Sequence, residues 1–240
     1  GTGVSSCKVM TGRYSSATVT VSMTAIADSG NFPSGGYVRG GSVSITVSGW
    51  NCNVSIVNSS GKSVASGSKG SVSASGLSDG SYTVNMSFMG AGWNPNPRSY
   101  ANYSMTADFS FVIDRSAPTI SGASTSSTGK YTNSSTYVSA SDSVSGVNAL
   151  YVKNPNNSYY SSAGTSTTIA STGTNGLYCF YAKDKAGNTS ATYYLYLDTV
   201  KPTGTIKNSN GTEITGSYTN QTFSYSATDS GSGISYLQYR

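Results

Sequence analysis

Ser42-Val-Ser-Ile-Thr-Val-Ser48 alternates hydroxyl residues with branched apolar residues at every step. In an extended chain successive side chains point to opposite faces, so Val43, Ile45 and Val47 share one face. The same period of two recurs in residues 18–24, 82–88 and 105–113. This alternation is typical of half-buried antiparallel strands. The sequence therefore predicts an all-β protein.

The composition fits a folded β protein and argues against catalysis. The 240 residues include 49 Ser, 28 Thr, 28 Gly and 19 Tyr, while charged residues make up 10% and histidine is absent. Disordered chains lack such a supply of aromatic and β-branched residues. Without histidine, acid–base or metal chemistry would depend on eight Asp, one Glu and three Cys. We therefore expect no enzyme and no cofactor.

The charge distribution gives no sign of a nucleic-acid or membrane partner. The net charge is +5, but the 14 Lys and Arg are scattered along the chain. Nucleic-acid-binding domains concentrate such residues on one face or one helix. The apolar stretches are far shorter than a bilayer requires. We expect no nucleic-acid binding and no membrane span.

The chain also repeats itself. Asp114-Arg-Ser-Ala-Pro-Thr119 recurs 84 residues later as Asp198-Thr-Val-Lys-Pro-Thr203, and Ser139-Ala-Ser-Asp142 returns as Ser226-Ala-Thr-Asp229. A unit of this length fits a small β-sandwich. The sequence predicts domains at 1–113, 114–197 and 198–240. The last holds only the first half of a repeat, so we expect a truncated sandwich cut from a longer array.

The first domain is a more divergent copy. Gly80-x-Tyr82-x-Val84 matches Gly176-x-Tyr178-x-Phe180, but the distance to the following boundary is longer in the first domain. The extra residues are predicted to form a long loop near 89–103.

These motifs resemble those of tandem bacterial immunoglobulin-like repeats. Three segments are similar to OmpL47-type and group 3 bacterial Ig-like domains: the boundary motif Asp-x-x-x-Pro-Thr, the run Ala-Ser-Asp-x-x-Ser-Gly-Val at 140–147, and residues 181–190. The resemblance covers 114–240 well and 1–113 only through strand pattern. It implies tandem immunoglobulin-like β-sandwich domains.

The resemblance also implies a location and a role. It implies an extracellular protein, secreted or attached to the bacterial cell surface, without catalytic residues. The expected role is an adhesin or stalk whose neighbours are further Ig-like repeats. The alternative is an accessory carbohydrate-binding or spacer region of a secreted multidomain glycan-active enzyme. A wall-anchoring signal would favour the first role, and an adjoining catalytic domain the second.

The inserted segment is the candidate ligand site. An exposed aromatic ring stacks on the apolar face of a sugar, while amide and guanidinium groups donate hydrogen bonds to its hydroxyls. The segment offers Trp93, Asn94, Asn96, Arg98, Tyr100 and Tyr103. We expect a host glycan or a host surface protein as the ligand. The alternative is that tryptophan packs into the core, as Trp50 would after an alternating strand.

The aspartates at repeat-equivalent places have two interpretations. Asp114 and Asp198 lie at the predicted junctions, and Asp142 and Asp229 lie in predicted loops. Carboxylate and carbonyl oxygens there could hold calcium. The spacing lacks the acidic density of a dedicated calcium site, which favours turn formation. The run 184–188 is interpreted as a hairpin turn for the same reason.

The three cysteines are given structural roles. Cys7 and Cys52 both belong to the first domain, and an exported protein could form a disulfide between them. Cys179 lies within a predicted strand and is interpreted as a small apolar residue that fills space. A catalytic thiol would need a base that a chain without histidine does not supply.

Overall fold

The computed structural model describes the backbone of residues 2–10, 16–26, 36–48, 52–95, 98–216, 220 and 222–238, and the side chains of 36–46, 52–87, 110–216, 220 and 222–238. These residues form strands and turns, which confirms the predicted all-β class. In this part of the chain we find no helix with the length and apolar character needed to cross a membrane.

The described chain divides into two compact units. The first comprises Gly1–Thr119, Ser141–Asn148 and Lys183–Ser190, and the second comprises the remaining residues. Strand β9 ends at Ile113 and β17 ends at Leu197, each directly before a predicted domain boundary. Because two loops of 114–197 group with the first unit, the boundaries themselves stay predictions.

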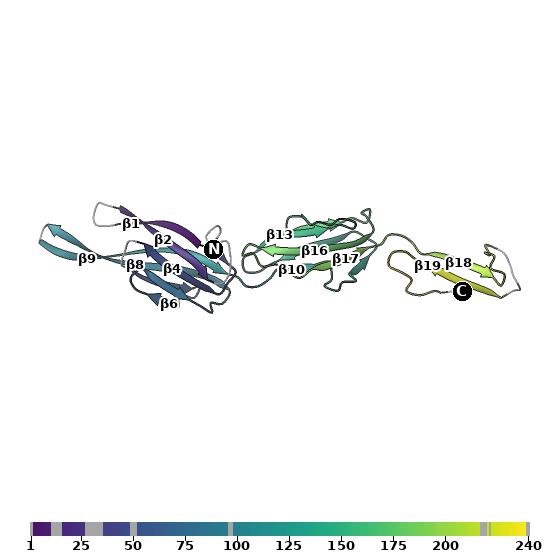
Figure 1. Cartoon of the computed structure of the whole chain (residues 1–240), viewed down its shortest axis with the longest axis horizontal. Coiled ribbons are helices and arrows are strands. Elements are labelled where there is room, and N and C mark those ends of the chain that lie inside the picture. The colour runs from purple at the N-terminus through teal and green to yellow at the C-terminus, as the bar shows by residue number, and fades with distance from the viewer. Residues whose placement is uncertain are drawn as a thin grey trace. The chain divides into compact units, whose positions relative to one another are not determined.

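The first sandwich places its core between two sheets, with strand orders β1-β2-β4-β7 and β3-β9-β8-β5-β6 (Figure 1). Fully buried Ile45 from one sheet and Ile56 and Val84 from the other belong to one core, as the period-2 pattern predicts. The strands are β1 (Thr2–Met10), β2 (Ser16–Ile26), β3 (Tyr37–Val38), β4 (Ser42–Ser48), β5 (Cys52–Asn58), β6 (Ser63–Gly67), β7 (Ser71–Ala74), β8 (Gly80–Pro95) and β9 (Arg98–Ile113).

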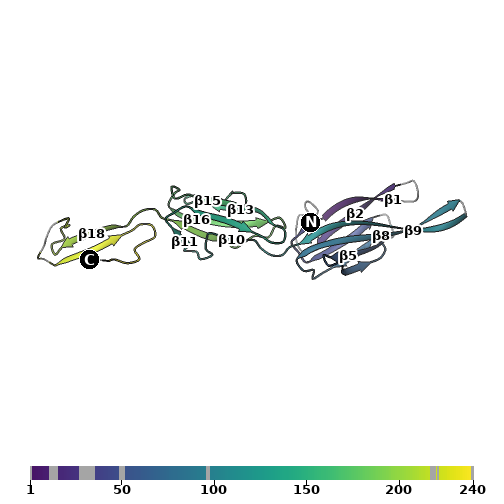
Figure 2. The ribbon, with the colours of Figure 1, turned by 180° about the vertical axis from the view of Figure 1, so that it is seen from behind.

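The second sandwich has sheets of order β10-β12-β15 and β11-β17-β16-β13-β14 (Figure 2). Val138 of the smaller sheet and Leu150 and Phe180 of the larger one are fully buried in a common core. The strands are β10 (Thr119–Ser121), β11 (Lys130–Thr132), β12 (Thr136–Ser141), β13 (Val147–Lys153), β14 (Ser161–Ser162), β15 (Ser166–Ile169), β16 (Gly176–Asp184) and β17 (Tyr193–Leu197).

Among the described residues of 198–238, β18 (Thr203–Asn208) pairs with β19 (Phe223–Thr228) in a two-stranded antiparallel sheet. These strands correspond to β10 and β12 of the preceding repeat. Large apolar side chains of this part remain exposed, among them Phe223 and Leu237. The described residues of this part therefore do not enclose a core of their own, and the assignment of 198–240 as the first half of a repeat stays a prediction.

The two complete sandwiches share their closing strand pair. In each, the last strand pairs in parallel with a short early strand, β9 with β3 and β17 with β11. In each, the next residue donates its N–H back to that early strand: Asp114 to the Val38 carbonyl at 2.8 Å, and Asp198 to the Thr132 carbonyl at 2.9 Å. The first domain is thus built on the same plan as the second.

A tyrosine at the same corner of each sandwich adds to this likeness. The Tyr82 hydroxyl donates to the Ser78 carbonyl at 2.9 Å, and the Tyr178 hydroxyl donates to the Thr174 carbonyl at 2.9 Å. Both rings are buried. This tyrosine corner is a hallmark of immunoglobulin-like sandwiches.

We expect Tyr178→Phe to lower the free energy of unfolding by about 1 kcal/mol, because it removes the hydrogen bond that ties this buried ring to the Thr174 carbonyl. Urea unfolding measures the change, and Tyr137→Phe on an exposed ring serves as the control. Equal stability of Tyr178→Phe and the control would show that the corner contributes nothing.

The expected loop near 89–103 differs in the structure. Strand β5 pairs with β8 only as far as Cys52↔Phe88, yet β8 and β9 continue as a paired hairpin from Met89↔Ser104 to Pro95↔Arg98. Figures 1 and 2 both show this extension. The inserted residues lengthen two neighbouring strands by similar amounts, so strand pairing satisfies their N–H and C=O groups.

Candidate functional site

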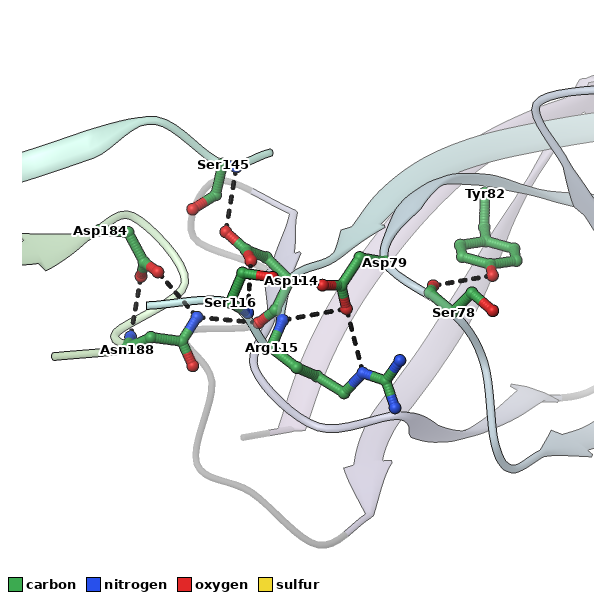
Figure 3. A network of polar contacts seen from close by, with 9 residues as sticks. All are labelled: Ser78, Asp79, Tyr82, Asp114, Arg115, Ser116, Ser145, Asp184 and Asn188. Carbon is green, nitrogen blue, oxygen red and sulfur yellow. Dashed lines mark hydrogen bonds and ion pairs between the residues drawn. The ribbon is translucent and has the colours of Figure 1, made fainter. Parts of the chain in front are cut away.

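Asp114 is the centre of a buried polar network where β9 ends (Figure 3). Its side chain is fully buried, as the exposure of the whole residue is 0%. Its carboxylate accepts a hydrogen bond from the Ser116 N–H at 3.0 Å and another from the Ser145 N–H at 3.0 Å. Ser145 is itself buried. The carboxylate therefore ties the segment after β9 to the loop Ser141–Asn148.

A second carboxylate fixes the same segment from the other side. Asp79 accepts hydrogen bonds from the Arg115 N–H at 3.1 Å, the Arg115 Nε–H at 3.0 Å and the Ser116 hydroxyl at 2.7 Å. Burial raises the pKa of Asp79, but the hydrogen bonds from Ser116 and Arg115 outweigh it and leave the pKa below its usual value of 3.8. The ionised form of Asp79 is the one that this segment stabilises.

The lowered pKa of Asp79 predicts a loss of stability in acid. A carboxylate with a lower pKa when folded contributes stability above pH 3.8 that is lost as the pH falls through its folded pKa. We expect the stability difference between the native chain and Asp79→Ala to shrink between pH 6 and pH 3, measured by urea unfolding. A difference that stays constant over this range would contradict the assignment.

Asp184 and Asn188 complete the buried network. The Asn188 N–H donates to Asp184 Oδ1 at 2.8 Å, and Asn188 Nδ2 donates to Asp184 Oδ2 at 2.7 Å and to the Asp114 carbonyl at 3.0 Å. Burial raises the pKa of Asp184 above its usual value although these hydrogen bonds oppose it. The Gly187 N–H returns to the Asp184 carbonyl at 3.3 Å, so the hairpin-turn interpretation of 184–188 is confirmed.

Three carboxylates converge at this place. Asp142 accepts the N–H groups of Val144 and Gly146 at 3.1 and 2.8 Å, as a turn-forming aspartate does. One oxygen each from Asp114, Asp142 and Asp184 can be chosen within 4.8 Å of one another. The sequence marks Asp114 and Asp142 as candidate calcium ligands because each has a counterpart in the next repeat. It assigns Asp184 only to a turn, because Asp184 has no such counterpart.

The other two predicted calcium ligands belong to the second linker and to a loop of the third repeat. Asp198 accepts the N–H groups of Val200 at 3.1 Å and Ser232 at 2.6 Å, and the Ser232 contact is the main cause of its lowered pKa. Asp229 accepts the N–H groups of Gly231 and Gly233 at 3.0 and 2.9 Å. Hydrogen bonds thus account for a turn-forming role at both linkers, and calcium stays a prediction.

The predicted ligand residues fall on the hairpin, where the structure describes only the backbone. Trp93 is the register partner of Tyr100, and Asn94 is the partner of Ser99. Arg98 and Tyr103 lie on the same strand as Tyr100, while Asn96 lies outside the described residues. The register brings two of the predicted aromatic residues opposite each other. Ligand binding here stays a prediction.

The cysteines occupy different parts of the fold. Cys52 is buried in the core of the first sandwich, at the start of β5. Cys7 lies on β1 in the other sheet of this sandwich, where it is the register partner of Val19 on β2. Their disulfide stays a prediction. Cys179 is a buried free thiol on β16, which agrees with its interpretation as a small apolar residue.

The chain matches no family model and none of the curated proteins. Among solved structures it is similar to the BSP domain of a biofilm-associated protein, with 21% identity, a TM-score of 0.22, and coverage of 67% of this chain but only 28% of that one. It is also similar to a tetra-tandem repeat in the extending region of a large adhesion protein, with 15% identity, a TM-score of 0.30, and coverage of 90% and 71%. Likenesses this low support neither a family nor a function.

Proposed function

We propose that this chain is a non-catalytic, extracellular part of a bacterial surface protein, in which it acts as a stalk or adhesin. The observation that carries the proposal is that one linker design occurs twice. Asp114 and Asp198 each follow the last strand of a sandwich, donate their N–H to the early parallel strand, and accept the N–H of a serine in a later loop, Ser145 or Ser232. Repetition of a linker serves an array of modules.

The carboxylates support a structural role over a catalytic one. All six aspartates with described side chains accept a hydrogen bond from a backbone N–H of a linker or turn. Glycosidases need two carboxyl groups held apart across a cleft, one of them free to donate a proton. Carboxylates that accept hydrogen bonds from nearby backbone N–H groups hold turns and linkers in place.

We further propose the β8–β9 hairpin as the ligand-binding part. It extends beyond the last pairing of β5 with β8, and its register places Trp93 opposite Tyr100. Binding residues concentrate on such projecting connections, because a rigid sandwich holds their base in place. The ligand class that suits paired aromatics flanked by Asn and Arg is a glycan or a glycosylated host surface protein.

The test is binding of the whole chain to mucins, host matrix proteins and plant polysaccharides, with EDTA as a control. We expect saturable binding to mucins or matrix proteins that is lost in Trp93→Ala and kept in Tyr137→Ala, an exposed aromatic on β12. Titrations without any binding signal would overturn ligand binding by the hairpin, and the stalk would then be the only remaining role. Binding confined to plant polysaccharides would replace the adhesin role by the accessory-module role, and their depolymerisation would overturn the non-catalytic assignment.

A further inference from the structure

The outward face of the second sandwich is lined with tyrosines. On β17, Leu195 and Leu197 are fully buried in the core, so the alternate residues Tyr194 and Tyr196 lie on the opposite face of the sheet. Tyr131 on β11 and the stacked pair Tyr151–Tyr181 on β13 and β16 share this face. The proposed function makes no use of these phenols.

Two of these phenols are close together, and one of them is open to solvent. Tyr131 and Tyr196 are register partners on parallel strands, with ring centroids 5.2 Å apart and ring planes tilted by 39°. Tyr131 is 51% exposed, and Tyr196 is half-buried. Tyr151 and Tyr181 are nearer at 4.7 Å, but both are half-buried and Tyr160 packs edge-on against Tyr181. Of these four rings, Tyr131 is therefore the one that an external oxidant reaches most readily.

Other easily oxidised side chains are scarce in this part of the chain. Both tryptophans and all five methionines precede residue 114, and the chain has no histidine. The thiol of Cys179 is the remaining competitor, and it is only 6% exposed. An oxidant in the solvent therefore reacts mainly with the tyrosines of the second sandwich.

We propose that Tyr131 and Tyr196 form an oxidative cross-linking site that yields dityrosine with hydrogen peroxide and a peroxidase. Each phenol gives up one electron and one proton, and the two radicals join through carbons ortho to their hydroxyls. The ortho hydrogens then move to the phenol oxygens as the rings regain aromaticity. One C–C bond replaces two C–H bonds, and one hydrogen peroxide is reduced to two waters.

The link would join an edge strand of three residues to the strand that closes the sandwich. Such a bond restrains the unfolded chain between two distant residues, as a disulfide does. We expect the oxidised protein to unfold at a higher temperature than the untreated protein. The exposed ring of Tyr131 changes rotamer rapidly, so it samples orientations toward the ring of Tyr196.

The experiment treats the whole chain with peroxidase and hydrogen peroxide at low protein concentration. Blue dityrosine fluorescence is measured, and mass spectrometry follows tryptic digestion. We expect a monomer lighter by two hydrogen atoms, in which the peptide 131–153 is joined to the peptide 186–207. Tyr131→Phe and Tyr196→Phe should each reduce this joined peptide to background.

Tyr137→Phe is the matched control, because Tyr137 is 61% exposed, lies in the same tryptic peptide and belongs to the other sheet. It should leave the yield unchanged, and Cys179→Ala should not lower it. The proposal is overturned if the joined peptide persists in Tyr131→Phe, if coupling occurs instead between 131–153 and 154–183, or if only covalent dimers form.

Discussion

Replacing Asp114 by alanine is expected to lower the free energy of unfolding by about 3 kcal/mol. The substitution removes two charge-assisted hydrogen bonds, each worth about 1.5–3 kcal/mol, and leaves the buried Ser145 N–H without its acceptor. The substitution also removes the repulsion between Asp114 and Asp184, which offsets part of this loss. The offset is small, because the charge of Asp114 affects the pKa of Asp184 less than the hydrogen bonds from Asn188 do.

Two measurements check this expectation. Urea unfolding gives the stability change, and trypsin cleavage after Arg115 reports whether the linker is held in place. Cleavage of a transiently opened segment follows its opening free energy, so we expect it to be at least about tenfold faster in Asp114→Ala. Asp114→Asn keeps one acceptor oxygen and should lose less. Equal cleavage rates in all three proteins would show that the carboxylate does not order the linker.

Leu150→Ala is expected to destabilise the second sandwich by about 3 kcal/mol, whereas Leu237→Ala should change stability by less than about 0.5 kcal/mol. The two leucines occupy equivalent positions, each five residues after the loop serine that binds the linker aspartate. Leu150 is fully buried, and Leu237 is 48% exposed. Truncation creates a cavity only at the first position.

The buried thiol of Cys179 gives a readout specific to the second sandwich. A thiol reagent reaches this residue when the sandwich opens, and mass spectrometry assigns the labelled peptide. A loss of about 3 kcal/mol corresponds to labelling about a hundredfold faster in Leu150→Ala. Leu237→Ala should label like the native chain. Faster labelling in Leu237→Ala would mean that Leu237 stabilises the second sandwich although its side chain is exposed.

The strands could be predicted because their signal is local. Val43, Ile45 and the corresponding residues of other strands alternate with polar neighbours, and burial follows that period directly. The repeat then places equivalent residues in equivalent strands. The hairpin at 89–103 could not be predicted in the same way, because its Gly-, Asn- and Pro-rich residues carry turn signals. Its pairing depends on the two strands that it prolongs.

In the polar network too, the sequence predicts contacts within one loop but not contacts between residues far apart in the chain. The turn-forming roles of Asp142 and Asp229 follow from their own loops, where each accepts N–H groups two and four residues further on. Asp79 contacts residues 36 and 37 positions away, and Asn188 contacts the carbonyl of Asp114. No spacing in the sequence encodes such partners, since the fold alone brings them together.

The parallel pairing of β11 with β17 has a mechanical consequence when the repeat is pulled from its two ends. Tension applied to the two ends of this repeat pulls β11 and β17 in opposite directions along their length. The hydrogen bonds between them are then loaded in shear, and they share the force instead of opening one after another. The pairing of β3 with β9 repeats this parallel arrangement in the first sandwich, where β1 and β2 precede β3. The second sandwich would therefore resist extension through its closing strands.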